Sequence, residues 1–218
     1  MKHCIYTNAL YDEIPDYAFV SQRQKEKYAN KYHIDYIQTS LNPRPDSHPV
    51  WCKPILCAWL LQQYDWVTWI DVDAMPVNME FSLPEYLENI KVPVVMGQDL
   101  NKWNTGVFSV RKDARDWLLE MDCRRSQYTR RFREQQCMGD SIDKGEIQCH
   151  IPPLEIGWND YLPSLYNRKS YEHDENIYRK GKSWILHLPA VDNTRRFGIL
   201  SREANDDCQV YDTPTYRG

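Results

Sequence analysis

The sequence predicts an α/β fold, with a central sheet and helices, built as a single domain over residues 1–218. Short apolar runs alternate with longer segments of helical periodicity through the first half of the chain. One run, residues 66–72, is almost entirely apolar, which is typical of a buried central strand. Only 8 glycines occur, so we expect no flexible linker between domains.

The individual elements follow from this alternation. Apolar and β-branched runs predict strands at residues 3–7, 34–38, 66–72, 92–97, 105–110 and 184–188. Helical spacing predicts helices at residues 17–32, 50–64, 113–121 and 130–138. In the first helix Phe19, Val20 and Tyr28 are the expected inward anchors, and the apolar second helix carries Trp51 and Trp59. The last third of the chain is less regular.

Composition excludes several classes of protein. Hydrophobic residues make up 42% of the chain, enough for a core, so a wholly disordered chain is excluded. The net charge of −4 argues against nucleic-acid binding by bulk charge. The longest apolar run, residues 55–61, is shorter than the roughly 18–20 residues of a membrane helix. With no signal peptide and no C-x-x-C pair among 7 cysteines, we expect free thiols and a cytoplasmic location.

Two carboxylates follow the most apolar strand. Asp71 and Asp73 stand two positions apart where that strand ends. Burying a carboxylate is costly without compensation, and the carboxyl ends of strands in open α/β sheets are where ligands bind. A Mg²⁺ or Mn²⁺ ion bridging to a polyphosphate would compensate. Because side chains i and i+2 of a strand face the same way, both acids are expected to reach one ion if the strand persists. The alternative is a polar turn.

Further positions have side chains suited to a phosphate, a sugar or a metal. Lys53 lies near the start of a helix, where the dipole favours an anion; the alternative is a solvated surface lysine. Asn104 and Thr105 precede Gly106, which lets a ligand approach the backbone closely; the alternative is a β-turn. His187 ends an apolar strand, and its imidazole suits Mn²⁺ ligation or a structural hydrogen bond.

Asp71-Val72-Asp73 after an apolar strand resembles the D-x-D metal-binding motif of nucleotide-sugar-dependent glycosyltransferases with the GT-A fold. This resemblance implies a Rossmann-like mixed central sheet flanked by helices. Other segments match as well, and they are Trp51-Cys52-Lys53-Pro54, Asn104-Thr105-Gly106-Val107-Phe108, Glu134-Gln135 and Ile185-Leu186-His187-Leu188. Their order and spacing are similar to the galactosyl/xylosyl/mannosyltransferase family over about residues 3–196. More closely, the chain resembles the N-terminal glycosyltransferase domain of a large multidomain protein of chloroviruses, which infect green algae.

The resemblance implies an activity and its partners. It implies a hexosyltransferase that depends on Mn²⁺ or Mg²⁺ and moves a sugar of glucose or rhamnose type from a UDP-sugar to a glycan acceptor. The closer viral resemblance implies glycan synthesis on a capsid glycoprotein in the host cytoplasm. It is also compatible with excision from a longer polypeptide that carries further domains.

The resemblance also implies roles for individual residues. The implied metal ligands are Asp71, Asp73 and His187. The implied donor-binding residues are Tyr6, Thr7, Asn8, Lys53, Asp71, Val72, Asp73, Asn104, Thr105, Gly106, Gln135 and Arg195. The candidate catalytic carboxylates are Asp71, Asp73, Glu134 and Asp140, while Asp99, Asp206 and Asp207 remain open.

Within this set, residues 6–8 would contact the nucleobase, and Arg195 with Arg196 and Lys182 would neutralise the diphosphate. Ordinary polar residues and solvated charges are the alternatives. On the acceptor side the candidates are Trp103, Trp158 and Asn159, with core packing as the equal alternative.

Two other functions and one further motif remain open. A metal-dependent phosphoryl hydrolase would use the same acidic pair but needs a water-activating carboxylate cluster. A non-catalytic nucleotide-sugar-binding module would not need Asp73 and His187 together.

Five arginines fall within residues 124–133. They could contact an acidic acceptor, a membrane surface or another domain, although a solvated helix face is favoured.

Overall fold

A computed structural model describes residues 1–10, 15–99, 102–130, 132–162 and 177–204. Its main sheet has six strands in the order β2-β1-β3-β6-β5-β7. The strands are β1 (His3–Asn8), β2 (Asp35–Thr39), β3 (Trp66–Ile70), β5 (Val94–Asp99), β6 (Lys102–Arg111) and β7 (Cys149–His150). β1 runs parallel to both β2 and β3, whereas β6 runs antiparallel to β3 and β5. The expected mixed sheet is confirmed.

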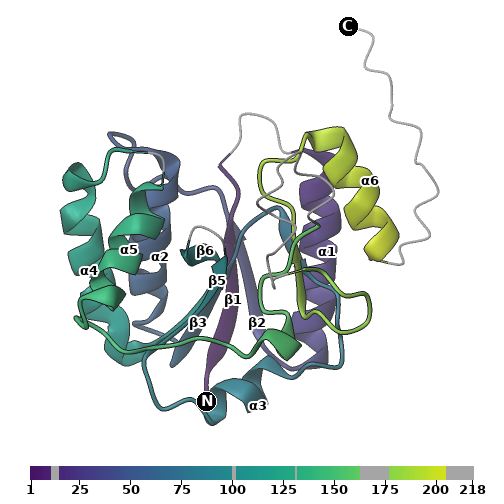
Figure 1. Ribbon diagram of the computed structural model, residues 1–218, viewed down its shortest axis with the longest axis horizontal. Coiled ribbons are helices and arrows are strands. Elements are labelled where there is room, and N and C mark those ends of the chain that lie inside the picture. Colours follow the sequence, from purple (N-terminus) through teal and green to yellow (C-terminus); the bar gives the residue numbers. More distant parts are fainter. Residues whose placement is uncertain (11–14, 100–101, 131, 163–176, 205–218) are drawn as a thin grey trace, which may run out of the picture.

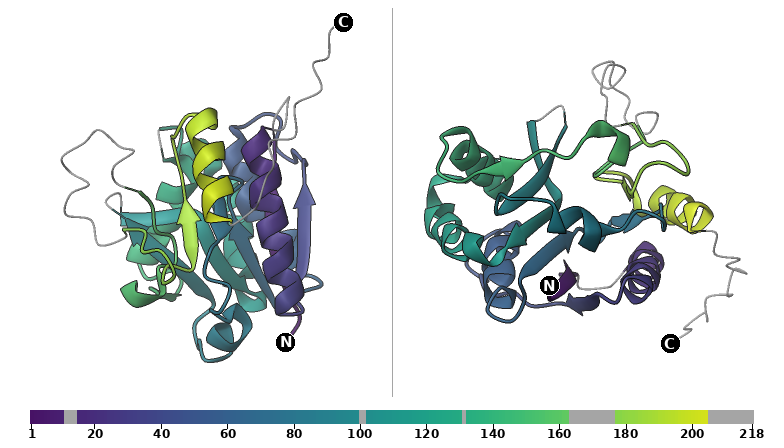
Figure 2. Two further views of the ribbon diagram at one scale, coloured as in Figure 1. Left: turned by 90° about the vertical axis from the view of Figure 1, so that its right-hand side faces the viewer. Right: turned by 90° about the horizontal axis from the view of Figure 1, so that it is seen from below.

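Helices cover both faces of this sheet (Figure 1). On one side lie α2 (Cys52–Leu60), α4 (Arg115–Cys123) and α5 (Arg133–Asp143). On the other side α1 (Asp16–Lys31) packs beside α6 (Asn193–Glu203), as both views of Figure 2 also show. The short α3 (Leu83–Glu88) lies below the sheet in Figure 1. None of the helices in the described ranges has the length and apolar character needed to cross a bilayer.

A second, two-stranded sheet joins distant parts of the chain. β4 (Ala74–Pro76) pairs antiparallel with β8 (Ile185–His187), and Ala74 stands opposite His187 in the register. The predicted strand 184–188 therefore exists, but it pairs outside the main sheet with a strand that was not predicted. α6 follows closely, and its N-cap Asp192 accepts a hydrogen bond from the Arg195 N–H at 3.0 Å.

Several predicted details are wrong. Val20 and Tyr28 are buried as expected, but Phe19 is 47% exposed, because each helical residue turns about 100° from the previous one. The predicted helix 50–64 is a 3-10 turn (Pro49–Trp51) followed by the shorter α2, and Trp59 on it is exposed.

The helix predicted at residues 130–138 begins three residues later and extends to Asp143, and the predicted strand 66–72 ends at Ile70. The candidates Asp206 and Asp207 lie outside the described residues.

A buried polar chain crosses the three central strands. His3 Nε2 lies 2.8 Å from Thr68 Oγ1, which in turn lies 2.7 Å from Ser109 Oγ. His3 Nδ1 is buried and has no hydrogen-bond partner among the described residues. Burial lowers the pKa of His3 to about 3, so the folded protein keeps this imidazole neutral.

This histidine makes stability depend on pH. The unfolded state takes up the proton near pH 6.5 while the folded state does so near pH 3, so stability falls as the pH decreases between these values. Between about pH 7.5 and about pH 5, we expect His3 alone to remove about 2 kcal/mol of unfolding free energy. Urea denaturation of wild type and His3→Asn at both pH values measures this; an equal pH dependence in the two proteins would contradict it.

Candidate functional site

The acidic pair lies in a tight turn between β3 and β4. Strand β3 stops at Ile70, and the Asp71 N–H then donates to the carbonyl of Gly106 on β6 at 2.8 Å. The Ala74 N–H returns to the Asp71 carbonyl at 3.1 Å, which closes the turn. We expected the two acids to share a face through strand alternation, but the strand ends before them. The turn brings their carboxylates together instead. The backbone is thus a turn, as the alternative predicted. A polar turn alone does not explain why the side chains of Asp71 and Asp73 cluster with that of His187.

Asp71, Asp73 and His187 form a candidate metal centre. One ligand atom from each residue lies within 4.8 Å of the others, and His187 Nε2 is 3.4 Å from Asp73 Oδ1. The β4–β8 pairing places His187 here, since its strand partner Ala74 directly follows Asp73. Mn²⁺ binds both carboxylate oxygens and imidazole nitrogens, whereas Mg²⁺ prefers the carboxylate oxygens. The residues therefore fit a divalent cation.

Gly106 makes room for this imidazole. It lies inside strand β6, so the β-turn alternative is wrong. A Cβ atom at this position would stand 2.2 Å from His187 Cε1 and 2.7 Å from His187 Nδ1. The close approach that requires glycine is therefore made by His187, in place of the ligand that the sequence suggested.

Arg196 and His187 hold Asp73. Arg196 Nη2 is 3.3 Å from Asp73 Oδ2, and the guanidinium also donates from Nε to the Leu188 carbonyl and lies 4.5 Å over the Tyr17 ring. Burial raises the pKa of Asp73, but the hydrogen bond from His187 and the charges of His187 and Arg196 outweigh it and hold this pKa below its usual range. The carboxylate is thus ionised at neutral pH.

Arg195 does not take part in this contact. Its side chain is 70% exposed and pairs with Asp192 at 3.5 Å, while the side chain of the next residue, Arg196, is only 9% exposed. Neighbouring residues on a helix point in directions about 100° apart, so only one of the two faces the acids. The expectation for Arg195 is corrected: Arg196 is the arginine at the site. Lys182 is also exposed.

Lys53 lies behind Asp71 as the centre of a buried network. Its Nζ is 2.9 Å from Asp71 Oδ1, 3.1 Å from the Thr105 carbonyl and 3.5 Å from Glu134 Oε1. Burial lowers the pKa of Lys53, but Asp71 and Glu134 more than offset this, so the pKa lies above its usual range. The solvated-lysine alternative is wrong. Trp69 adds a 2.6 Å hydrogen bond from Nε1 to Asp71.

A second buried lysine was missed by the sequence analysis. Lys25 Nζ donates to the Asp71 carbonyl at 2.7 Å from beneath the turn. Burial lowers the pKa of Lys25 to about 7, although the charges of Asp71 and Asp73 act in the opposite direction. The spacing of Lys25 could have indicated its burial. It lies on the same face of α1 as Ser21 and the predicted inward anchor Tyr28, and all three are buried.

A pocket of about 240 Å³ opens beside the acidic pair. Among the implied donor-binding residues it is lined by Asn8, Lys53, Asp71, Val72 and Asp73. Tyr6 and Thr7 do not line it. Tyr6 is buried edge-on against Trp69, and Thr7 Oγ1 donates to the Ile70 carbonyl.

The remaining candidates form a polar layer next to this pocket. Thr105 donates from Oγ1 to Glu134 at 3.0 Å and from its N–H to Gln135 Oε1 at 3.4 Å. Asn104 donates to Asp99 at 2.6 Å. Burial raises the pKa of Glu134, and the charge of Lys53 partly offsets this shift.

Asp140 lines a different groove of about 290 Å³, which it shares with Gln135 and Trp103. The ring of Trp103 packs against Gly139, where a Cβ atom would stand 2.6 Å from it. Trp158 lies in the core and donates to the Val107 carbonyl. Trp158 therefore packs in the core, whereas Trp103 both packs in the core and lines this groove. Asn159 is buried, and its amide atoms have no partner in the described part of the chain.

The comparisons with known proteins bear on the fold. No protein-family model matches the sequence, and no curated protein matches it. Solved structures do match. A glycosyltransferase involved in glycosylation of the major capsid of PBCV-1 is 15% identical, with 93% of this chain and 100% of that chain covered and a TM-score of 0.68. The galactosyltransferase LgtC, with donor and acceptor sugar analogues, is 13% identical, with 92% and 95% covered and a TM-score of 0.54.

Mouse xyloside xylosyltransferase 1 is 9% identical, with 87% of this chain and 97% of that chain covered and a TM-score of 0.51. The chain has the GT-A fold of these glycosyltransferases. The resemblance to such enzymes, including a chlorovirus one, is thus confirmed at the level of fold.

The contact between Gly106 and His187 predicts a matched pair of variants. Gly106→Ala forces the imidazole away from the acids, so we expect Mn²⁺ binding to weaken about tenfold or more and stability to fall by about 1–3 kcal/mol. Gly198→Ala is the control, since a Cβ there meets no atom within 4 Å. Calorimetric titration with Mn²⁺ measures the affinity, and unchanged affinity in Gly106→Ala would remove His187 from the metal centre.

Proposed function

We propose that the protein is a metal-dependent glycosyltransferase, a single domain that moves a hexosyl residue from a UDP-sugar to a glycan acceptor. The convergence of Asp71, Asp73 and His187 beside a pocket at the carboxyl end of β3 carries the proposal. The fold neighbours support it, because they are named as a capsid glycosyltransferase, a galactosyltransferase and a xylosyltransferase.

The finer assignment concerns the sugar, the acceptor and the location. Within the proposal the transferred sugar is glucose or rhamnose, the glycan belongs to a viral capsid glycoprotein, and the reaction takes place in the host cytoplasm. The name of the neighbour from PBCV-1 refers to glycosylation of a major capsid, and it supports the capsid part of this assignment. The sugar and the location follow from the sequence resemblance alone.

The charges around the pocket suit a departing diphosphate. Asp71, Asp73 and His187 would hold Mn²⁺ or Mg²⁺, which supplies positive charge to the leaving group when bound. Arg196 is fixed beside Asp73, and a guanidinium is suited to bidentate contacts with phosphate oxygens. Lys53 lines the pocket and is already charged, so it requires little reorganisation to meet an anion.

The candidate catalytic carboxylates differ in their surroundings. Glu134 lies in the buried layer behind Asp71, where Lys53 and Thr105 orient it. Asp140 faces the neighbouring groove that it shares with Gln135. We place Glu134 on the donor side and Asp140 on the acceptor side of the reaction.

The alternatives receive less support. A hydrolase of the two-metal type needs a second cluster of carboxylates, and Asp71, Asp73 and His187 make the one group of metal-compatible side chains found in the described ranges. The nearby Glu134 is held by Lys53 and is not free to activate water. A binding module would not need the paired acids and the imidazole together.

Ligand binding should stabilise the fold. We expect UDP with Mn²⁺, each at about 100 times its Kd, to raise the melting temperature by about 5–10 °C. Asp73→Asn should abolish the increase, because it removes a ligand charge, whereas Asp116→Asn, at an exposed carboxylate on α4, should keep it. A thermal scan tests this; no increase with UDP, GDP, ADP or dTDP would overturn the donor assignment.

The two adjacent arginines make a second test. In a panel of UDP-sugars assayed for slow hydrolysis, we expect Arg196→Gln to lower kcat about 10- to 100-fold, because it removes a cation beside the diphosphate. Arg195→Gln should stay within about twofold, since its side chain points to solvent. Circular dichroism checks that both variants fold. Equal losses in the two variants would refute the role of Arg196.

A further inference from the structure

The arginine-rich stretch does not form the single solvated helix face that was favoured from the sequence. Residues Arg124–Gln127 form a 3-10 turn, and α5 begins only at Arg133. Arg124 pairs with Glu120 at 3.0 Å and with Glu146 at 2.6 Å, which is a structural role. Arg130 is exposed, and residue 131 lies outside the described ranges. The other two arginines line a groove.

This arginine groove, defined by Arg125 and Arg133, has a volume of about 680 Å³. The segment before α2 forms one wall with Ser47 and His48, and Thr129 lies on the other wall. Hydroxyl, imidazole and guanidinium groups therefore face one concave surface. Such a set of hydrogen-bond donors suits an oxyanion.

Arg125 is held in place by several partners. Its Nη2 is 3.4 Å from Asp46, its Nε donates to Ser47 Oγ at 3.2 Å, and its Nη1 donates to the Asp122 carbonyl at 3.2 Å. Asp46 is exposed, so it screens this guanidinium only weakly. A fixed guanidinium loses little conformational entropy when it binds an anion.

Arg133 brings uncompensated positive charge. Its guanidinium makes no ion pair with a carboxylate of the described residues. It lies near His48, since burial lowers the pKa of His48 and the charge of Arg133 lowers it further. With two arginines, one exposed acid and a neutral histidine, the arginine groove carries a net positive charge although the whole chain is acidic.

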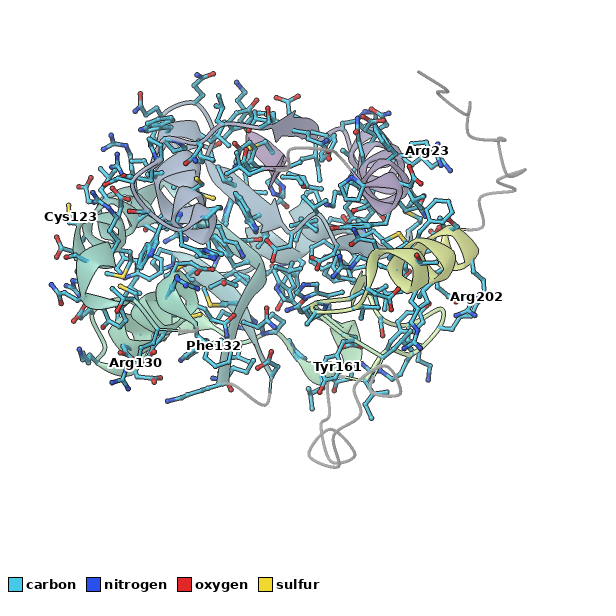
Figure 3. All side chains as sticks on the ribbon, turned by 90° about the horizontal axis from the view of Figure 1, so that it is seen from above. Arg23, Cys123, Arg130, Phe132, Tyr161 and Arg202 are labelled. Carbon is cyan, nitrogen blue, oxygen red and sulfur yellow. The ribbon has the colours of Figure 1, made fainter. Side chains whose placement is uncertain are left out.

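The arginine groove lies at the same edge of the sheet as the acidic pair. β6 runs antiparallel to β3, so α4 returns to the edge where β3 ends, and α5 starts there. His48 and Trp51 line the arginine groove, while the intervening Pro49 and Val50 line the pocket beside Asp71. Figure 3, seen from above, shows Cys123, Arg130 and Phe132 along this flank.

We propose that the arginine groove binds an anionic group of the acceptor glycan, a carboxylate or a phosphate or sulfate ester, while the donor occupies the pocket beside Asp71. The acceptor part of this inference rests on the proposed function. The anion site itself rests only on the groove. The single intervening turn between groove and pocket allows one sugar chain to reach both.

Binding without nucleotide tests the site directly. Calorimetric titration with glucose 6-phosphate, glucuronate and glucose should show binding of the two charged sugars and not of glucose. Arg133→Gln and Arg125→Gln should each weaken that binding about tenfold, because each removes a charged donor. Arg130→Gln is the matched control from the same stretch and should bind as wild type. Saturating UDP and Mn²⁺ should not compete, which distinguishes the groove from the pocket beside Asp71.

Transfer assays test the link to the acceptor. With a UDP-sugar donor, the ratio of kcat/KM for charged over neutral acceptors should fall about tenfold in Arg133→Gln and stay unchanged in Arg130→Gln. The proposal is overturned if neither charged sugar binds. It is also overturned if Asp73→Asn abolishes binding of the charged sugars while the two arginine variants keep it. Anionic vesicles of phosphatidylserine that bind when soluble charged sugars do not would assign the groove to a membrane. Charged-sugar binding without any transfer would retain the anion site and refute the proposed function.

Discussion

Two carboxylates at the end of a buried strand need positive charge around them, and the core of this structure is arranged to provide it. Lys53 on α2 pairs with Asp71 from one face of the sheet. From the other face Arg196 on α6 pairs with Asp73, and Lys25 on α1 holds the main chain of the turn between them. Because desolvated charges are costly without such partners, each helical layer is tied to the same short turn.

The same arrangement prepares the turn for ligands of both signs. Asp73 is already ionised, so a metal cation would not need to displace a proton from it. The surrounding cations are fixed by their own hydrogen bonds, so a phosphate would meet oriented charge and not mobile side chains. Interactions that are set before a ligand arrives are the ones that contribute most to a charged transition state.

The sequence was sufficient for features that depend on local patterns and insufficient for those that depend on the rotation of an element. The apolar runs before Asp71 and His187 indicated two strands with polar side chains at their ends. The alternation of elements indicated the α/β class. The mixed direction of the strands came only from the resemblance to GT-A enzymes. The choice between Arg195 and Arg196 depends on how α6 is rotated, which a polar helix start does not reveal. Lys25 was missed because a lysine is expected at the surface.

The small sheet of β4 and β8 has a consequence for the order of folding. It joins residues 74–76 to residues 185–187, and β8 supplies the imidazole of the candidate metal centre. During synthesis the acids leave the ribosome long before that imidazole does. The loop between them must close before the three side chains meet, so the candidate metal centre is complete only when nearly all of the described residues are made.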